Sequence, residues 1–414
     1  MSNGAVLDDL SKVVDDRVRP ATSTDAIDGV LPAYVAVPSC TEQTAEVLRV
    51  AAQNGLHVVA RGAGTKQDWA FPPDQVDLVI DTTAMSGVVE HAAGDLITIV
   101  RAGTLLTELR STLAGADQEL ALDSAFPSAT VGGTVAANIS GPRRVRYGTL
   151  RDLLIGITFV RADGVIAKAG GKVVKNVAGY DFGKLLTGSF GTLGVITEVA
   201  LRLHPLPRTR RAVTVEMPDG ELAAQAALRV LRSQVVPSAV EVSQPADGAP
   251  SVLALIEGVE AGVGARVETT QTLLGPTSEI GELPDSFGRY PFEPGDIGFK
   301  ISTTLSGVGP VLTAARGLGQ RLGAPISVRG SAAGVLYAAL PAGTDPAATG
   351  QVLAELRTVA ASFDGTVVVL TGPAPTRRML DVWGPVSGLD LMKRLKDQLD
   401  PEHRLAPGRF VGGI

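Results

Sequence analysis

Three glycine-rich segments carry the strongest chemical signal in this sequence, because glycine lets a backbone turn sharply or approach a bulky ligand closely. They are Arg61-Gly62-Ala63-Gly64-Thr65, Thr130-Val131-Gly132-Gly133-Thr134 and Gly191-Thr192-Leu193-Gly194-Val195-Ile196-Thr197. Backbone N–H groups freed at such points form concave anion sites, and a threonine hydroxyl adds a donor. Three segments of this kind predict one large, multiply charged cofactor.

The elements around the first segment would place it at the edge of a sheet. Residues 42–54 carry Ala45, Leu48 and Ala51 on one helical face, and residues 56–60 are an apolar run of strand length. Taken alone, the glycine segment favours an ordinary strand-to-loop turn, since Gly-x-Gly is common. It lacks the third glycine of a Rossmann fingerprint and the Gly-Lys-Ser/Thr ending of a Walker loop.

In combination, the motifs resemble the FAD-binding domain of the vanillyl-alcohol oxidase/p-cresol methylhydroxylase (PCMH) family over residues 28–207. The matching pieces follow in the family's order: residues 61–65, 77–81, 97–103, 130–138, 175–181 and 191–197. The resemblance implies an α+β chain with a PCMH-type FAD-binding domain, followed by an α+β cap domain.

The same resemblance implies which residues bind FAD. The first two glycine segments would surround the pyrophosphate, Asn138 and Gly141 would lie along the flavin, and the third segment would take the adenine-ribose end. The implied cofactor-binding residues are Arg61, Gly62, Ala63, Gly64, Thr65, Thr130, Gly132, Gly133, Thr134, Asn138, Gly141, Gly191, Gly194, Val195 and Ile196. Thr65 stands where relatives with covalent flavin carry histidine, so non-covalent FAD is expected.

Within that family, the chain is most similar to the FAD-binding subunits of bacterial glycolate oxidases. The residues that carry this likeness lie at 141–148, 170–181 and 407–413. It implies an FAD subunit of a complex that oxidises 2-hydroxy acids, with a sister FAD subunit and an Fe–S subunit as partners. One departure is Ala406, which replaces the Asn of the family's Asn-Pro-Gly and so loses any contact made by the Asn side chain.

The pattern of elements predicts three parts. Pro205 and Pro207 mark the end of the FAD-binding domain at residues 28–207. Residues 208–380 contain two successive βαββαβ-like patterns, which predict a ferredoxin-like cap with helices on one face of the sheet, and residues 275–294 between them are expected to be a loop. Residues 381–414 carry a helix at 389–399, and the family resemblance implies that this segment returns to the FAD domain.

Composition excludes several classes of protein. The 414 residues have a net charge of −6, and Arg143, Arg144 and Arg146 form one short basic cluster rather than a binding stripe, which argues against nucleic acid. Cys40 is the only cysteine, so disulfides, Fe–S clusters and cysteine-based zinc sites within the chain are excluded. The start at Met1 lacks a signal-peptide pattern and no apolar run is long enough to span a bilayer. We expect a cytoplasmic protein without direct membrane insertion, whose partners could hold it at a membrane.

The substrate side gives a weaker signal. Flavoproteins that oxidise 2-hydroxy acids commonly hold a metal with a pair of nearby histidines, whereas His57, His91, His204 and His403 are far apart, so no metal site is expected. By family position, the candidate catalytic residues are Arg146, Lys175 and Tyr180, and Lys172 and Asp181 are further candidates at the flavin edge. Asp181 could equally be the N-cap of a helix at residues 182–187.

Two functional hypotheses from different classes follow. In the first, the chain is an FAD-dependent oxidoreductase that itself oxidises a small 2-hydroxy acid such as glycolate or D-lactate. In the second, it is an electron-transferring subunit of a glycolate oxidase complex; the absent histidine pair and the lack of cysteine clusters favour this role. A flavin-free scaffold is a third and weaker hypothesis.

Overall fold

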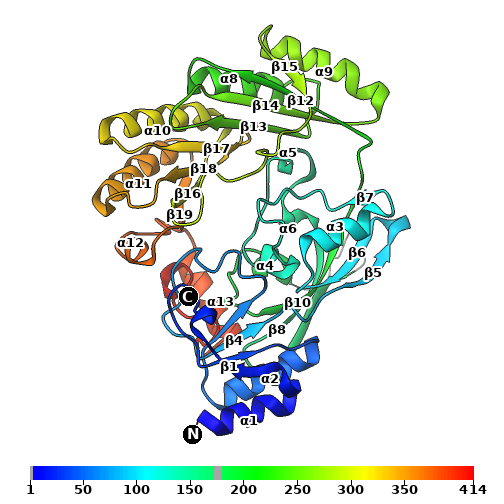
Figure 1. The fold of residues 1–414 in the computed structure, drawn as a ribbon, viewed down its shortest axis with the longest axis vertical. Helices are drawn as coiled ribbons and strands as arrows, with labels where there is room; N and C mark the ends of the chain where they lie inside the picture. Colours follow the sequence, from blue (N-terminus) through cyan, green and yellow to red (C-terminus); the bar gives the residue numbers. More distant parts are fainter. Residues whose placement is uncertain (1–2, 172–179) are drawn as a thin grey trace.

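Three larger β-sheets follow one another along the long axis of the molecule (Figure 1). This computed structural model describes residues 3–171 and 180–414. The N-terminal elements lie at the bottom of Figure 1, and the largest sheet lies with its helices at the top.

The first sheet comprises β1 (Val18–Pro20), β2 (Tyr34–Ala36), β3 (Val58–Arg61) and β4 (Leu78–Asp81), in the order β1-β2-β4-β3. β2, β4 and β3 run parallel, and β1 is an antiparallel edge strand. Two amphipathic helices, α1 (Asn3–Val14) and α2 (Thr41–Gln53), pack beside it through a common apolar cluster. The parallel arrangement brings the ends of β3 and β4 to one edge, where the first glycine segment begins.

The second sheet is antiparallel and has the order β5-β6-β10-β8-β9. Side chains alternate along its strands, so that Val160 and Val195 pack toward α2 whereas Phe159 and Ile196 join the core on the other face. Four short helices contribute to that second core. The elements are β5 (Val88–Ala92), β6 (Ile97–Arg101), β8 (Leu154–Val160), β9 (Ile166–Gly170), β10 (Val195–Arg202), α3 (Leu106–Ala114), α4 (Val131–Ala136), α6 (Leu150–Leu153) and α7 (Phe182–Leu186).

Smaller elements complete this half of the chain. A two-stranded sheet pairs β7 (Gln118–Glu119) with β11 (His204–Pro205), and α5 (Arg144–Tyr147) faces the third sheet. Asp181 accepts a hydrogen bond from the backbone N–H of Lys184 at 3.2 Å. The N-cap alternative for Asp181 is therefore the one that the structure contains.

The third sheet has eight antiparallel strands in the order β15-β12-β14-β13-β17-β18-β16-β19. It consists of two βαββαβ units joined through β13 and β17, which confirms the predicted ferredoxin-like α+β class. The first unit contains β12 (Thr209–Glu216), α8 (Gly220–Leu231), β13 (Ala239–Gln244), β14 (Ser251–Gly258), α9 (Glu260–Leu274) and β15 (Glu279–Gly281). The second contains β16 (Ile297–Ser302), α10 (Val308–Leu322), β17 (Ser327–Ser331), β18 (Val335–Leu340), α11 (Pro346–Ala361) and β19 (Thr366–Thr371).

The helices cover one face of this third sheet, which we call the cap sheet. Phe299 and Ile301 of β16 are fully buried in the core that the helices share. Lys300 lies between them in sequence and therefore points to the opposite face. There it stands directly opposite Tyr337 of β18. This opposite face, which we call the inner face, also carries apolar residues such as Leu255 and Val368, and it lies toward the rest of the molecule (Figure 1).

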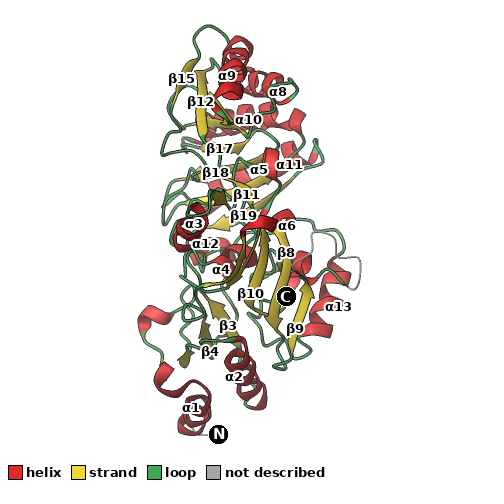
Figure 2. Cartoon of the chain, turned by 90° about the vertical axis from the view of Figure 1, so that its right-hand side faces the viewer, coloured by secondary structure: helices red, strands yellow, loops and turns green. Residues whose placement is uncertain are grey.

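The C-terminal segment packs against the first sheet. After α12 (Ala374–Arg378) and α13 (Leu389–Leu399), Val58 of β3 donates to Arg404 and accepts from Ala406 through backbone bonds of 2.8 Å. The fully buried Lys396 ammonium donates to Asp400 at 2.7 Å and to the carbonyl groups of Thr192 and Leu405. These bonds hold α13 beside the start of β10 (Figures 1 and 2).

The strand β15 was not predicted from sequence. β15 lies in the stretch 275–294 that was expected to be a loop, and its three residues are all exposed at the sheet edge. Because β12 begins a new sheet, we propose three parts. The FAD-binding domain expected from sequence, which we call the flavin half, ends at residue 207. The cap spans residues 208–380, and the C-terminal segment that returns to the flavin half spans residues 381–414. In the described part of the chain, every helix is too short or too polar to cross a bilayer.

Candidate functional site

The three glycine segments meet in one cleft, which we call the cofactor cleft. It lies where β3 ends, where α4 begins and where the chain enters β10, and one wall comes from the C-terminal segment. Its lining residues are Ala60, Arg61, Gly62, Ala63, Gly64, Thr65, Lys66, Gln67, Thr82, Thr130, Gly132, Gly133, Ala136, Ala137, Phe190, Gly191, Gly194, Ile196 and Arg409. Residues that are far apart in sequence are thus brought to one place.

The first loop has free backbone donors. Among the described residues, the N–H groups of Gly62, Ala63, Gly64 and Thr65 find no hydrogen-bond acceptor. Gly64 adopts φ +74°, a left-handed conformation that glycine reaches without a Cβ penalty. Successive free amides around such a residue form a concave donor site for anions. The loop therefore fits a pyrophosphate.

Close packing explains the glycines at the base of the cleft. A Cβ at Gly132 would lie 2.7 Å from the Cβ of Ala102, which is too close for any side chain there. Thr130 caps α4 by accepting a hydrogen bond from the Gly133 N–H at 3.3 Å. The second segment is therefore the tightly packed start of a helix rather than an isolated β-turn.

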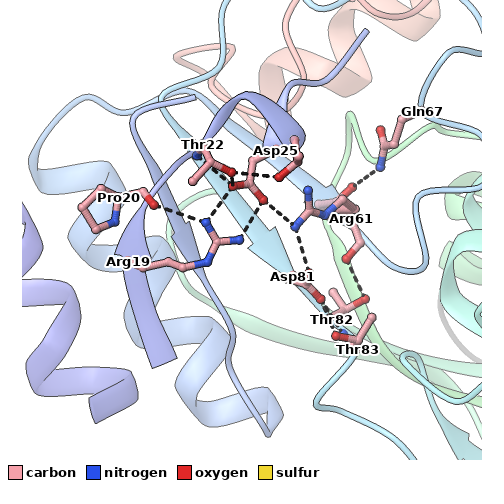
Figure 3. Close-up of polar contacts among 11 residues, drawn as sticks. Arg19, Pro20, Thr22, Asp25, Arg61, Gln67, Asp81, Thr82 and Thr83 are labelled. Atoms are coloured by element: carbon pink, nitrogen blue, oxygen red, sulfur yellow. Dashed lines mark hydrogen bonds and ion pairs between the residues drawn. The ribbon is translucent and has the colours of Figure 1, made fainter. Parts of the chain in front are cut away.

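The Arg61 side chain anchors the first loop through two carboxylate groups. Its guanidinium group donates to Asp25 at 3.2 Å and to Asp81 at 3.0 Å (Figure 3). Arg19 also binds Asp25 through two hydrogen bonds of 2.7 and 2.8 Å. The hydrogen bond from Arg19, assisted by those from Thr22 and Arg61, holds the pKa of Asp25 well below its usual range. The charge of Arg61 is therefore matched by carboxylates, and its backbone is what lines the cleft.

Two cations of the cleft were missed from sequence. Lys66 is buried, donates to the Thr65 hydroxyl at 2.7 Å and has no carboxylate partner in the described ranges. Burial lowers its pKa to about 8. Arg409 is almost fully buried and binds the Gln67 side chain at 3.1 Å and the Gln67 carbonyl at 2.7 Å. Lys66 directly follows the first loop and Arg409 lies in the motif at residues 407–413, but neither was expected to bind the cofactor, and the fold brings Arg409 to the loop.

Four of the residues implied to bind FAD lie outside the lining of the cofactor cleft. Thr134 is buried beneath it and donates to the Thr130 carbonyl at 2.7 Å, and Val195 faces the core around α2. Asn138 lines a neighbouring cavity, described next, and Gly141 lies against Asp123.

The neighbouring cavity, which we call the cap cavity, lies between the cofactor cleft and the inner face of the cap sheet. It has a volume of 240 Å³ and shares Ala137 and Phe190 with the cleft. The side-chain oxygen of Asn138 and the indole N–H of Trp383 are buried there without a partner in the part of the chain described. Its lining residues are Trp69, Ala137, Asn138, Ile139, Gly188, Phe190, Lys300, Ser302, Tyr337, Thr366, Val368, Leu370, Trp383 and Phe410.

Two of the candidate catalytic residues from sequence, Arg146 and Tyr180, are not among the residues that line this cavity. Arg146 is exposed on α5, with its guanidinium group 5.7 Å from the Tyr147 ring centre. Tyr180 is 84% exposed, and its ring contacts Phe182. Lys172 and Lys175 fall outside the described residues. Among the described residues, the polar side chains that the cap sheet brings to the cap cavity are Lys300, Ser302, Tyr337 and Thr366.

An ionic network joins the flavin half to the cap. Arg143 binds Glu119 and Asp123, each at 2.7 Å, and approaches Glu257 of β14 within 3.6 Å. Arg210 of β12 binds Glu119 at 2.9 Å and Glu257 at 2.8 Å. Because these groups are mostly buried and alternate in sign, they fix the cap over the cleft.

The four histidines lie apart from one another, and each contacts a different residue. His57 binds Asp77 at 2.9 Å, His91 binds Gln118 at 2.9 Å and His403 binds Asp397 at 2.8 Å. His204 packs against the ring of Tyr147. Within the described ranges, no group of three or more His, Cys, Asp or Glu side chains is arranged to hold a metal ion.

Comparison with known proteins agrees with this geometry. Residues 32–170 match the family model described as FAD binding domain. An uncharacterized FAD-linked oxidoreductase of Mycobacterium tuberculosis is 27% identical over 92% of this chain and 91% of its own length. A D-lactate dehydrogenase of Archaeoglobus fulgidus is 31% identical over 57% of this chain and 54% of its own length. Glycolate oxidase subunit GlcE of Escherichia coli is 35% identical over 35% of this chain and 43% of its own length.

The fold has a matching solved structure. p-Cresol methylhydroxylase is similar with a TM-score of 0.75 over 98% of this chain and 96% of that chain, at 16% sequence identity. The chain therefore has the PCMH-type fold, its residues 32–170 are an FAD-binding domain, and its cofactor is FAD.

Proposed function

We propose that this FAD-dependent oxidoreductase oxidises a small 2-hydroxy acid at its own flavin. The observation that carries the proposal is the cap cavity, which adjoins the cofactor cleft and shares the lining residues Ala137 and Phe190 with it. A bound FAD supplies the hydride acceptor for such an oxidation. A cavity of 240 Å³ suits a molecule of few heavy atoms, and aromatic side chains form part of its walls.

The residues of this chain have separable roles in that reaction. The free amides from Gly62 to Thr65, with Lys66, would bind the pyrophosphate, and Asn138 offers an unpaired acceptor beside the cavity. The names of the D-lactate dehydrogenase and of the glycolate oxidase subunit support a 2-hydroxy acid as substrate class.

The test is anaerobic reduction of the flavin. The purified FAD-loaded protein is mixed with glycolate, D-lactate or L-lactate, and flavin absorbance is followed in a stopped-flow instrument. Rapid bleaching by one enantiomer or by glycolate supports the proposal. Oxidised flavin that persists with every 2-hydroxy acid, in protein with a full complement of FAD, contradicts it.

A second candidate is the role of FAD-carrying subunit in a glycolate oxidase complex. Two observations favour it: the likeness to a protein named as a glycolate oxidase subunit, and the single cysteine, Cys40, which leaves electron transfer to Fe–S centres to other chains. In this case the isolated chain would turn over hydroxy acids poorly. A sister FAD subunit and an Fe–S subunit would restore activity, and co-purification from the native source would identify them.

A further inference from the structure

Two cationic side chains at the junction of cap sheet and flavin half have no carboxylate partner among the residues described. Lys300 lines the cap cavity and forms no hydrogen bond or ion pair with any described group. Arg144 makes only a long contact of 3.4 Å to the Ser140 carbonyl, and its Nε is buried without an acceptor. Other arginines at this junction, such as Arg143, are matched by carboxylates.

The two cations share one neighbour and influence each other. Tyr337, which lies opposite Lys300 on the next strand, lines both the cap cavity and the small adjoining pocket that contains Arg144. Burial, followed by the nearby charge of Arg144, lowers the pKa of Lys300 to about 8. Two like charges in a poorly solvated space repel each other until an anion joins them.

The carboxyl groups beside these pockets do not neutralise Lys300 and Arg144. Asp123 is bound by the backbone N–H and the side chain of Arg143, at 2.8 and 2.7 Å. Glu241 accepts from the Gly288 N–H at 3.0 Å, and burial raises its pKa to about 7. The lining of the cap cavity contains no acidic residue. The anion must therefore come from a ligand.

Resting on the proposed function, we propose that Lys300 and Arg144 together bind the carboxylate of the substrate. Tyr337 lines both pockets, and burial raises the pKa of its phenol, so the hydroxyl keeps its proton. The site then selects anionic substrates through side-chain cations, without a metal ion. A neutral amide or alcohol of the same shape would leave both cations unpaired and would bind more weakly.

The test is equilibrium binding of an anion and its neutral counterpart to the oxidised FAD-loaded protein. Oxalate and lactamide are titrated at pH 7 while the flavin absorbance spectrum is recorded. In Lys300→Met, which keeps the length of the side chain, oxalate should bind at least about tenfold more weakly, while lactamide binding stays within about twofold. Arg144→Met should behave in the same way, and Lys300→Arg should recover most of the oxalate affinity. Lys168→Met, at an exposed lysine of β9, is the matched control and should bind oxalate like the wild type.

The outcomes separate this proposal from the proposed function. Unchanged oxalate affinity in both Lys300→Met and Arg144→Met overturns the anion site, as does an equal loss for oxalate and lactamide. Oxalate binding that depends on Lys300, in a protein whose flavin no 2-hydroxy acid reduces, supports the anion site and contradicts the proposed oxidation. If Lys300→Met does not retain FAD, Arg144→Met and Lys300→Arg decide the result.

Discussion

Gly62 and Thr130 are in direct contact at the base of the cofactor cleft: a Cβ at Gly62 would lie 2.1 Å from Thr130 Oγ1. Thr130 is itself fixed because its hydroxyl caps α4. The loop of free amides after β3 and the start of α4 therefore hold each other in place, although they are far apart in sequence.

Gly62→Ala should weaken FAD binding at least about tenfold while the apoprotein still folds, because the new methyl group must push the loop away from Thr130. FAD affinity is measured by fluorescence titration of the apoprotein, with circular dichroism as the check on folding. The double variant Gly62→Ala/Thr130→Ala removes the clashing hydroxyl and should recover part of the affinity. Full FAD affinity in Gly62→Ala would show that the contact does not shape the site.

FAD should be released completely by acid precipitation, because Thr65 stands where covalent relatives carry histidine and the nearby Lys66 already donates to the Thr65 hydroxyl. The supernatant should contain one FAD per chain by absorbance, and the washed pellet should be colourless. A yellow pellet would mean that another residue forms a covalent bond to the flavin.

FAD affinity should fall as the pH rises from 7 to 9. The pKa of Lys66 is lowered to about 8 by burial, so the apoprotein loses this positive charge within that range. Lys66→Met should bind FAD about tenfold more weakly at pH 7 and should show little further change up to pH 9. Parallel pH profiles for wild type and Lys66→Met would assign the titration to another group.

Asp25→Asn should lower the free energy of unfolding by about 2 kcal/mol at pH 7, because Arg61 and Arg19 lose the ion pairs that each forms with this buried carboxylate. The pKa of Asp25 is depressed in the fold, so its contribution is present above the unfolded pKa of about 3.9 and is lost as the pH falls. Urea titrations should therefore show a difference between wild type and variant that narrows below about pH 4. Asp16→Asn, at an exposed position, should match the wild type both at pH 7 and below about pH 4.

Local signals in the sequence were sufficient for much of the fold. The bounds of helices α10 and α11 follow from local residues, because Gly323 adopts the left-handed conformation just after α10 and Pro346 begins α11 after the Asp345 cap. β15 could not be predicted in this way. It is an exposed edge strand whose position depends on pairing with β12 rather than on its own residues.

The candidate site was only partly predictable for a similar reason. Glycine segments signal a backbone function, so the cofactor loops could be found from sequence alone. Lys300 reads as one polar residue in a strand, and its importance appears only when β16, β18 and the flavin half enclose a cavity. Arg61 stands in the predicted loop, but Asp25 and Asp81 draw its guanidinium group away from the cleft.

The C-terminal segment sets the order in which the site can be completed during synthesis. Arg404 and Ala406 continue the hydrogen bonding of β3 at Val58, and Arg409 ties down Gln67 in the cofactor loop. A ribosome-bound chain that has already made all three glycine segments still lacks this support. We therefore expect firm retention of FAD only after residue 409 has left the ribosome.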